Sequence, residues 1–183
     1  MPPIIWAKTP KCAGTSIKRT YHQQIKDGDI IQLLPNEIEM FCFKHSDLWA
    51  SCYKFAVIRN PFDRAISAWK YLPETKDRLL IDVLKDYPKK WYGYKKWMHF
   101  TQTQTDMLSD VDGFIPHDKL IRFEDLEAGL SEVMAANGMQ PIKIIHINRS
   151  VRDRDYRKYY NAETRRLVER MYWMDLKLFG YEF

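Results

Sequence analysis

Short apolar runs that favour β-strands alternate along this chain with segments of helical spacing. The runs cover residues 4–7, 30–34, 54–58, 119–123 and 143–147, and most of their residues are β-branched, aromatic or leucine. Strands that alternate with helices form α/β domains whose sheet is mainly parallel. The run at 4–7 is apolar on both faces, as is usual for a central strand covered by helices on both sides. With 183 residues, the chain has the length of one domain, so we expect a single α/β domain over residues 1–183.

Helical spacing and capping residues predict helices between these runs. The first should begin near Thr15 and bury Ile17 and Tyr21. The second should begin at Asn60, a good N-cap residue, with Pro61 at the first helical position. Further helices are expected over 79–87, from 126 to a stop at Gly138, and from a cap at Asn161 toward Gly180.

The net charge indicates the kind of ligand, and the cysteines indicate the cellular compartment. The net charge of +5 suits an anionic ligand, although it is spread along the chain as on an ordinary solvated surface. Cys12, Cys42 and Cys52 are odd in number and match no metal spacing, which favours reduced thiols. No stretch approaches the roughly 20 apolar residues of a membrane span, and a strand-like run already begins at residue 4. We therefore expect a cytoplasmic protein without a signal peptide or membrane span.

The loop between the first strand and the first helix suits an anion. It reads TPKCAGTS, residues 9–16, and such a loop offers unpaired backbone N–H groups and the positive end of the helix dipole. Gly14 permits close approach of the backbone, Thr15 and Ser16 bring hydroxyl groups, and Lys11 adds a cation. An ordinary capped helix start would also contain Ser and Thr, so that alternative stays open.

This loop does not have the Walker form, G-x-x-x-x-G-K-[ST], in which lysine stands beside the hydroxyl residue that binds magnesium. It contains one glycine, Gly14, and Lys11 precedes it by three positions. The strand run at 54–58 is followed by Arg59 and not by the aspartate that a magnesium site would need. The sequence therefore predicts a nucleotide site without a metal.

A second candidate phosphate site follows the third apolar run. Arg59 leaves this run, and Asn60, Arg64 and Ser67 are spaced so that they share one face of the next helix. An arginine fork beside a hydroxyl group can bind a phosphate dianion at two points. The alternative is structural, with Arg59 or Arg64 paired to Asp63 or to a surface acid.

Together these motifs resemble those of sulfotransferases that use 3′-phosphoadenosine 5′-phosphosulfate (PAPS), in particular the carbohydrate type related to heparan sulfate 2-O-sulfotransferases. The similar segments are TPKCAGTS (9–16), VIRNPFDRAISAW (57–69), LIRFEDLE (120–127), HINRS (146–150) and YYNAETRRLVERMYWMDLKLFGYEF (159–183). The resemblance implies a P-loop-like three-layer fold with a central, mainly parallel sheet flanked by helices. It also implies transfer of a sulfuryl group from PAPS to an acceptor hydroxyl, with adenosine 3′,5′-bisphosphate (PAP) as the product and no metal.

The resemblance also assigns roles to individual residues. Residues of the first loop would bind the 5′-phosphosulfate, while Arg59 and Ser67 would bind the 3′-phosphate. Arg149 and Ser150 would help to enclose the nucleotide. The first-loop residues of this predicted cofactor site are Lys11, Cys12, Ala13, Gly14, Thr15 and Ser16.

Sulfuryl transfer needs positive charge at the leaving oxygen and a base at the acceptor hydroxyl. Lys11 can supply the charge. Among the five histidines, His45 lies shortly before the third apolar run, where the resembling enzymes carry their histidine base, so it is our first candidate. His99 is the reserve, and Glu124 is a further candidate that could equally be a capping residue. His117, after a proline in an expected turn, is predicted to be a surface residue.

The segment 89–104 combines flat aromatic side chains with lysines. Such surfaces stack on sugar rings and attract anionic polysaccharides, although the same aromatic residues also pack in cores. We expect Trp97, His99 and Gln104 to contact the acceptor, a hydroxyl-bearing molecule and most simply a saccharide. No nucleic acid or membrane partner is expected.

Two other functions stay open at this stage. A metal-dependent nucleotide or nucleoside phosphotransferase would also bind phosphates here, but the position of Lys11 and the missing aspartate argue against it. A non-catalytic module that binds nucleotides or polyanions would share both loops, but it would not need His45.

Overall fold

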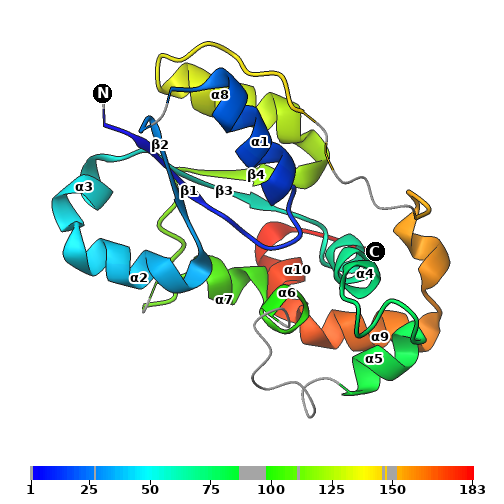
Figure 1. Ribbon diagram of the computed structural model, residues 1–183. Helices are drawn as coiled ribbons and strands as arrows, with labels where there is room; N and C mark the ends of the chain where they lie inside the picture. Colours follow the sequence, from blue (N-terminus) through cyan, green and yellow to red (C-terminus); the bar gives the residue numbers. More distant parts are fainter. Residues whose placement is uncertain (1, 27, 87–97, 111, 146, 148–151) are drawn as a thin grey trace. The chain divides into compact units, whose positions relative to one another are not determined.

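The computed structural model describes residues 2–26, 28–86, 98–110, 112–145, 147 and 152–183 (Figure 1). The chain divides into two compact units, which are described separately. Unit 1 comprises Met1–Ile58 and Met107–Asn148, and unit 2 comprises Arg59–Asp106 and Arg149–Phe183. We expected a single domain over residues 1–183. Whether the two units form one domain depends on how they assemble, so this expectation stays a prediction.

Unit 1 contains a four-stranded parallel sheet. Its strands are β1 (Ile4–Ala7), β2 (Ile30–Leu33), β3 (Lys54–Ile58) and β4 (Lys119–Arg122), in the order β2-β1-β3-β4. Every neighbouring pair runs parallel. Four of the predicted runs are therefore strands, and the predicted α/β class with a central parallel sheet flanked by helices is confirmed. All four residues of β1 are buried, as expected for a central strand.

One face of this sheet packs on two helices, α1 (Gly14–Gln24) and α8 (Leu126–Ala136), which lie on the same side in Figure 1. Burial of apolar surface between these layers is the main source of stability. At Gly129 of α8 an added Cβ would clash with the Ile121 side chain, so this glycine allows the helix to lie close to β4. Buried residues of this core include Trp6, Phe55, Val57 and Ile121 from the strands, Ile17 and Tyr21 from α1, and Leu130 and Val133 from α8.

The fifth predicted strand is wrong for its described residues, 143–145 and 147, which do not form a strand. Its described residues run alongside α1, and their backbone groups bond to side chains of that helix. Because these helix residues are four positions apart, they lie on one face of α1. The prediction was wrong because an apolar run indicates burial but not the partner that satisfies its backbone. The bonded pairs are Gln24 with Lys143 (2.8 and 3.0 Å), Thr20 with Ile145 (3.0 Å) and Ser16 with Ile147 (3.0 and 3.3 Å).

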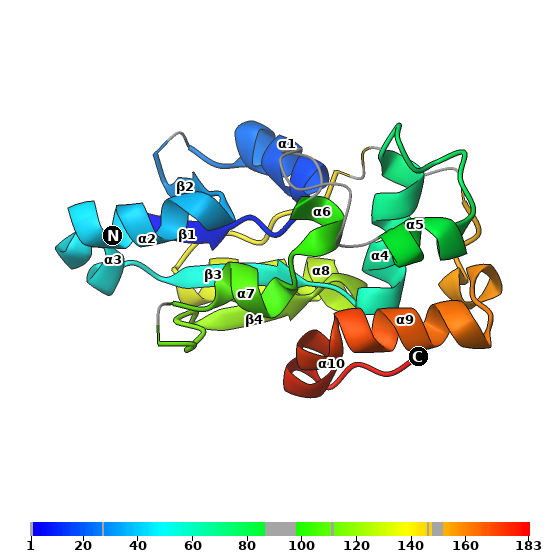
Figure 2. The same cartoon turned by 90° about the horizontal axis from the view of Figure 1, so that it is seen from below.

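Two helices that the sequence analysis did not predict connect β2 to β3. These are α2 (Pro35–Lys44) and α3 (Ser46–Ser51), and they meet at His45. At the start of α2 the Glu37 carboxylate accepts a hydrogen bond from Leu34 N at 2.7 Å. The end of α3 lies beside the amino end of β3, where Lys54 Nζ donates to the Trp49 carbonyl at 3.2 Å. The joint between α2 and α3 therefore lies toward the amino ends of the strands and away from their carboxyl ends (Figures 1 and 2).

Unit 2 is helical in its described part. The side chain of Asn60 caps α4 by accepting from Phe62 N at 3.0 Å, as predicted. Asn161 begins a helix that was expected to run to Gly180, but this helix is interrupted at Tyr172. Its elements are α4 (Pro61–Tyr71), α5 (Leu80–Asp86), α6 (Met98–Thr101), the 3-10 helix η2 (Tyr156–Tyr159), α9 (Ala162–Met171) and α10 (Trp173–Phe179), while α7 (Gln104–Leu108) spans the boundary of the two units.

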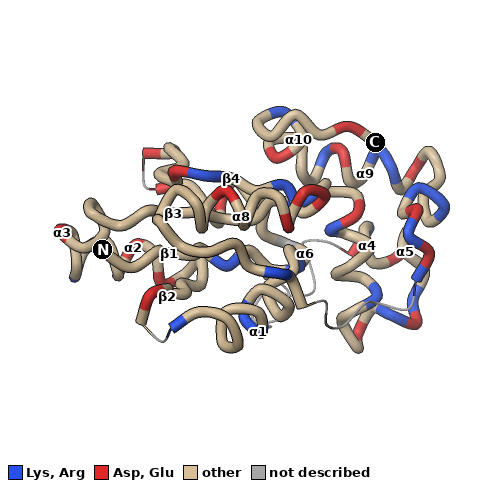
Figure 3. Tube along the Cα trace, turned by 90° about the horizontal axis from the view of Figure 1, so that it is seen from above, with Lys and Arg blue, Asp and Glu red and all other residues tan. Residues whose placement is uncertain are grey.

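Basic and acidic residues are interspersed over both units, without a long continuous stretch of either sign along the described trace (Figure 3). This agrees with the even spread of charge in the sequence. Within the described ranges, no helix combines the length and the apolar composition that crossing a bilayer requires.

Candidate active site

The loop between β1 and α1 holds two non-glycine residues in the left-handed region. Lys11 has a φ of 67° and Ala13 a φ of 60°. Few non-glycine residues adopt this conformation, which costs of order 1 to 3 kcal/mol and tends to occur at functional sites. Left-handed residues next to a helix start curl the backbone so that successive N–H groups can face one side, as in anion-binding nests. The loop therefore has the backbone form of an anion site.

Helix α1 begins without a capping side chain. Its N-cap residue is Ala13, which makes no side-chain cap bond, and the first turn contains no acidic residue. By contrast, α4 and α9 are capped by the side chains of Asn60 and Asn161. The first N–H groups of α1 and the positive end of its dipole are thus left to a ligand.

The sequence analysis gave no role to Lys8, directly before this loop, or to Thr9, its first residue. The Lys8 side chain crosses Gly14, where an added Cβ would lie 2.7 Å from Lys8 Cε. Burial, with a smaller effect of Lys18, lowers the pKa of Lys8. The Thr9 hydroxyl is buried and has no hydrogen-bond partner among the described residues. Their position directly after an apolar strand was the only available signal.

The predicted loop residues have different surroundings. Thr15 is exposed at the start of α1. Ser16 is buried, and its hydroxyl bonds the backbone of Ile147. Cys12 is buried in the core of unit 1, with its Sγ donating to the Pro10 carbonyl at 3.6 Å. Of these three side chains, Thr15 is therefore the one placed to meet a ligand from solvent.

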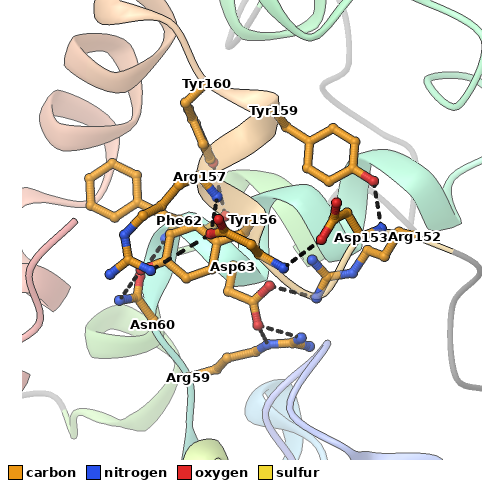
Figure 4. Close-up of polar contacts among 11 residues, drawn as sticks. Arg59, Asn60, Phe62, Asp63, Arg152, Asp153, Tyr156, Arg157, Tyr159 and Tyr160 are labelled. Atoms are coloured by element: carbon orange, nitrogen blue, oxygen red, sulfur yellow. Dashed lines mark hydrogen bonds and ion pairs between the residues drawn. The ribbon is translucent and has the colours of Figure 1, made fainter.

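Unit 2 contains a buried ion-pair cluster around Asp63 (Figure 4). Arg59 Nη2 lies 2.6 Å from Asp63 Oδ2, and Arg152 Nη2 lies 2.5 Å from Asp63 Oδ1. Both arginine side chains are 8% exposed. Two guanidinium groups share one carboxylate, so these three side chains together carry one net positive charge. The pairing of Arg59 with Asp63, left open by the sequence, is present, and Arg152 is a member that the sequence analysis missed.

Gln104 is fully buried and is bonded to the backbone of Arg59. Arg59 N donates to Gln104 Oε1, and Gln104 Nε2 donates to the Arg59 carbonyl. Asp175, also fully buried, accepts from Gln104 N and Thr105 N, each at 2.8 Å. We predicted that Gln104 contacts the acceptor, but a buried amide with these partners supports Arg59 instead.

A family model described as the sulfotransferase family matches residues 2–182. The chain belongs to this family. The comparisons with curated proteins and with solved structures found no match to the chain. Membership confirms the predicted transfer of sulfate in general and implies an acceptor that bears a hydroxyl group. It disfavours the phosphotransferase alternative.

In this sulfotransferase the predicted site residues on α4 are placed differently from Arg59, which precedes that helix. Arg64 is fully buried, and its Nη2 donates to the Gln102 carbonyl at 2.8 Å. Its guanidinium lies 5.6 Å from the centre of the Tyr172 ring. Ser67 is half-buried on the same helix. Arg64 therefore stabilises the packing within unit 2.

The candidate bases of the sulfotransferase lie in different places. His45 is exposed at the joint of α2 and α3, with its ring centre 4.9 Å from that of Phe41. This joint lies toward the amino ends of the strands, whereas the loop with Lys11 follows the carboxyl end of β1 (Figures 1 and 2). His99 is on α6 in unit 2. Glu124 lies in η1 (Phe123–Asp125), directly after β4 and at the same edge of the sheet as the loop. The structure thus brings Glu124, and not His45, to the edge that carries Lys11.

His117 is half-buried, although the sequence predicted a surface residue. Both of its ring nitrogens are buried without a partner among the described residues. Burial lowers the pKa of His117 to about 4, with Asp118 opposing and Lys54 reinforcing this shift. The ring is therefore neutral near pH 7.

Three predicted residues of the sulfotransferase, Trp97, Arg149 and Ser150, lie outside the described residues. Their roles stay predictions. Across the part of the chain that the structure describes, no group of three or more His, Cys, Asp and Glu residues could hold a metal ion.

Proposed function

We propose that this sulfotransferase transfers the sulfuryl group of PAPS to a hydroxyl group of a saccharide. The observation that carries the proposal is the uncapped start of α1 behind a loop with two left-handed residues, Lys11 and Ala13. A loop of this form suits a phosphosulfate group.

We assign residues to the two ends of the nucleotide as the resemblance implies. The backbone of residues 12–16 and the Lys11 ammonium group bind the 5′-phosphosulfate. Arg59, oriented by Asp63 and Gln104, binds the 3′-phosphate, with Ser67 as a hydroxyl donor. The net positive charge of the Arg59 cluster supports this assignment, since a dianion needs such charge. We assign Arg149 and Ser150 to the enclosure of the nucleotide, as the resemblance implies.

PAPS supplies the sulfuryl group, and residues of the chain supply the charge and the base. As the bond from the acceptor oxygen to sulfur forms, the bond from sulfur to the 5′-phosphate oxygen breaks. Lys11 stabilises the negative charge that develops on this phosphate oxygen. PAP is then the second product.

For the base we propose Glu124 in place of His45, because Glu124 lies at the edge of the sheet that carries the loop. Glu124→Gln should lower kcat by about 100-fold or more and leave the affinity for PAP unchanged. His45→Ala is the matched comparison and should retain the rate. The reverse pattern would restore His45 as the base, and a loss only in His99→Ala would assign the role to that residue.

We also propose a cytoplasmic location. Cys12, Cys42 and Cys52 form no disulfide, which suits the reducing compartment that the odd cysteine count predicts.

The test of the proposed function is calorimetric titration with PAP, with and without magnesium, and with ATP for comparison. Tight binding of PAP that does not depend on magnesium and that ATP does not match is the expected result. It would be followed by transfer of labelled sulfate from PAPS to saccharide acceptors. Preference for ATP with magnesium would overturn the proposal in favour of a phosphotransferase.

A further inference from the structure

The Lys8 side chain occupies the space that a side chain at Gly14 would fill. An added Cβ at Gly14 would lie 2.7 Å from Lys8 Cε, 3.3 Å from Lys8 Cγ and 3.5 Å from Lys8 Cδ. Gly14 is the first residue of α1 and does not have a positive φ, so other residues could adopt its backbone conformation. A glycine is therefore needed here for room, and Lys8 is the neighbour that takes the room.

This placement brings the ammonium group of Lys8 to the first turn of α1. The Cα–Cβ bonds of a helix tilt toward its N-terminus, so the space beside Gly14 lies on that side of the turn. The ammonium nitrogen is one bond beyond Cε. Lys18, four residues after Gly14, lies on the same face of α1. Burial, and to a smaller extent the charge of Lys18, lowers the pKa of Lys8.

No acidic group offsets the charge of Lys8 within the part of the chain that the structure describes. Its ammonium group forms no ion pair or hydrogen bond there, and the first turn of α1 contains no acidic residue. By comparison, the ammonium group of Lys54 donates to the carbonyl groups of Trp49 and Cys52. The positive end of a helix dipole disfavours a cation and favours an anion. A half-buried ammonium group at this turn is therefore unfavourable in the protein alone and becomes favourable when an anion binds beside it.

We propose that Lys8 is a second cation of the sulfotransferase site and binds the 5′-phosphate of PAPS directly. This role rests on the proposed function, which supplies the anion. The phosphate group is present in PAPS, in the transition state and in PAP, so Lys8 contributes to binding at each stage. Lys11 differs, because its charge is needed mainly when the leaving oxygen becomes negative. Lys8 thus serves affinity for the nucleotide, and Lys11 serves the rate.

The experiment compares Lys8→Met with the unmodified protein by calorimetry. The ligands are PAP and adenosine 3′-phosphate, which lacks the 5′-phosphate. Methionine keeps a stem beside Gly14 and removes the charge. The dissociation constant of PAP should rise about tenfold or more, and that of adenosine 3′-phosphate should change less than about twofold, because only PAP can make the charge-assisted contact. At saturating PAPS, kcat should fall less than about threefold.

Two matched variants serve as controls. Lys8→Arg keeps the charge and should bind PAP within about threefold of the unmodified protein. Lys18→Met removes an exposed lysine of the same helix face and should raise the PAP dissociation constant less than about twofold, because solvent screens its charge.

Gly14→Ala tests the position of the lysine. The new methyl group would lie against Lys8 Cε, so the lysine stem must move away from the turn. In the Gly14→Ala background, Lys8→Met should therefore change the PAP dissociation constant by less than about twofold, against about tenfold in the unmodified background.

NMR spectra of protein with labelled lysine give a direct readout in the unmodified chain. The signal of Lys8 is identified by its loss in Lys8→Arg. A bound anion favours the charged form of an ammonium group, so PAP should raise the pKa of Lys8, and adenosine 3′-phosphate should leave it as it is. This measurement decides the role of Lys8 even where Lys8→Met does not fold.

Several outcomes would overturn the inference. One is an unchanged affinity for PAP in a Lys8→Met variant that thermal unfolding shows to be folded. Another is an equal loss of affinity for PAP and adenosine 3′-phosphate together with a lower Tm of the ligand-free variant, which would mean that Lys8 supports the loop. A third is an undiminished effect of Lys8→Met in the Gly14→Ala background. Failure of the unmodified protein to bind PAP would instead overturn the proposed function, and the role of Lys8 with it.

Discussion

The side-chain amide of Gln104 bonds both backbone groups of Arg59, accepting from its N–H at 2.8 Å and donating to its carbonyl at 2.9 Å. The orientation of Arg59 at the end of β3 thus depends on a residue 45 positions further along the chain. Asp175 fixes Gln104 in turn, through bonds to its backbone N–H and its amide. In a buried network of this kind, removal of one member leaves several polar groups without partners.

Gln104→Leu keeps most of the side-chain volume but removes the amide. We expect the free energy of unfolding to fall by about 2 to 4 kcal/mol, because the Arg59 backbone and Asp175 lose partners. Affinity for PAP should fall about tenfold, since Arg59 is no longer held in place. Urea unfolding and calorimetry measure the two effects. Gln102→Leu, at an exposed position two residues earlier, is the control, and a Gln104→Leu variant with normal PAP affinity would contradict the positioning role.

Arg59→Ala should weaken binding of PAP by about 100-fold and that of adenosine 5′-phosphate, which lacks the 3′-phosphate, by less than about threefold. The reason is that a guanidinium group bonded to a dianion contributes a charge-assisted interaction that only PAP can make. Calorimetry with both nucleotides measures the difference. Arg157→Ala, at an exposed arginine of unit 2, should affect neither nucleotide. Equal losses for the two nucleotides would remove Arg59 from the 3′-phosphate site.

Lys11→Ala should lower kcat by about 100-fold or more while changing the PAP dissociation constant by less than about fivefold. Its charge matters most when the leaving oxygen becomes negative, so the loss falls mainly on the transition state. Transfer assays and calorimetry on the same preparation separate the two quantities. Lys44→Ala, at an exposed lysine of α2, should behave like the unmodified protein. An unchanged rate in Lys11→Ala would exclude Lys11 from the chemistry.

His117 should make the stability of the protein depend on pH. Its pKa is about 4 in the folded state, below the usual value of 6.5, so the unfolded state binds more protons between these values. The contribution of His117 is therefore complete above pH 6.5 and is lost as the pH falls from 6.5 to about 4, up to about 3 kcal/mol in total. Urea unfolding at pH 7.0 and 4.5 measures this loss, which His117→Gln should reduce. His22→Gln, at an exposed histidine, should leave the pH dependence as it is, and an equal slope in His117→Gln would refute the assignment.

The strands and helix starts that have strong local signals could be predicted from the sequence. β3 matches its predicted range, and Asn60 caps α4 as expected, because capping and apolar runs are local properties. The helices α2 and α3 were missed although Pro35 and Glu37 form a recognisable helix start. The signal was present there, but the periodicity of the following residues was weak.

The site was only partly predictable, for a physical reason. The order of residues 9–16 was enough to indicate an anion loop, since backbone N–H groups and the helix dipole follow from position alone. The partners of Arg59 were not predictable in the same way, because Gln104, Arg152 and Asp175 are distant in the sequence and meet it only through the tertiary fold. Burial of Gln104, which changes its role, also depends on that fold.

The row of Ser16, Thr20 and Gln24 shows that a helix can take the place of a neighbouring strand. Four residues of helix rise by about 6.0 Å, and two residues of extended chain advance by about 6.6 Å. The two repeats match closely enough for every second residue of 143–147 to meet one polar side chain of α1. When an apolar run is not part of a sheet, its backbone can instead bond to a helix that has hydroxyl or amide side chains at every fourth position. Such a helix, read from the sequence, is therefore a signal that a nearby apolar run is not a strand.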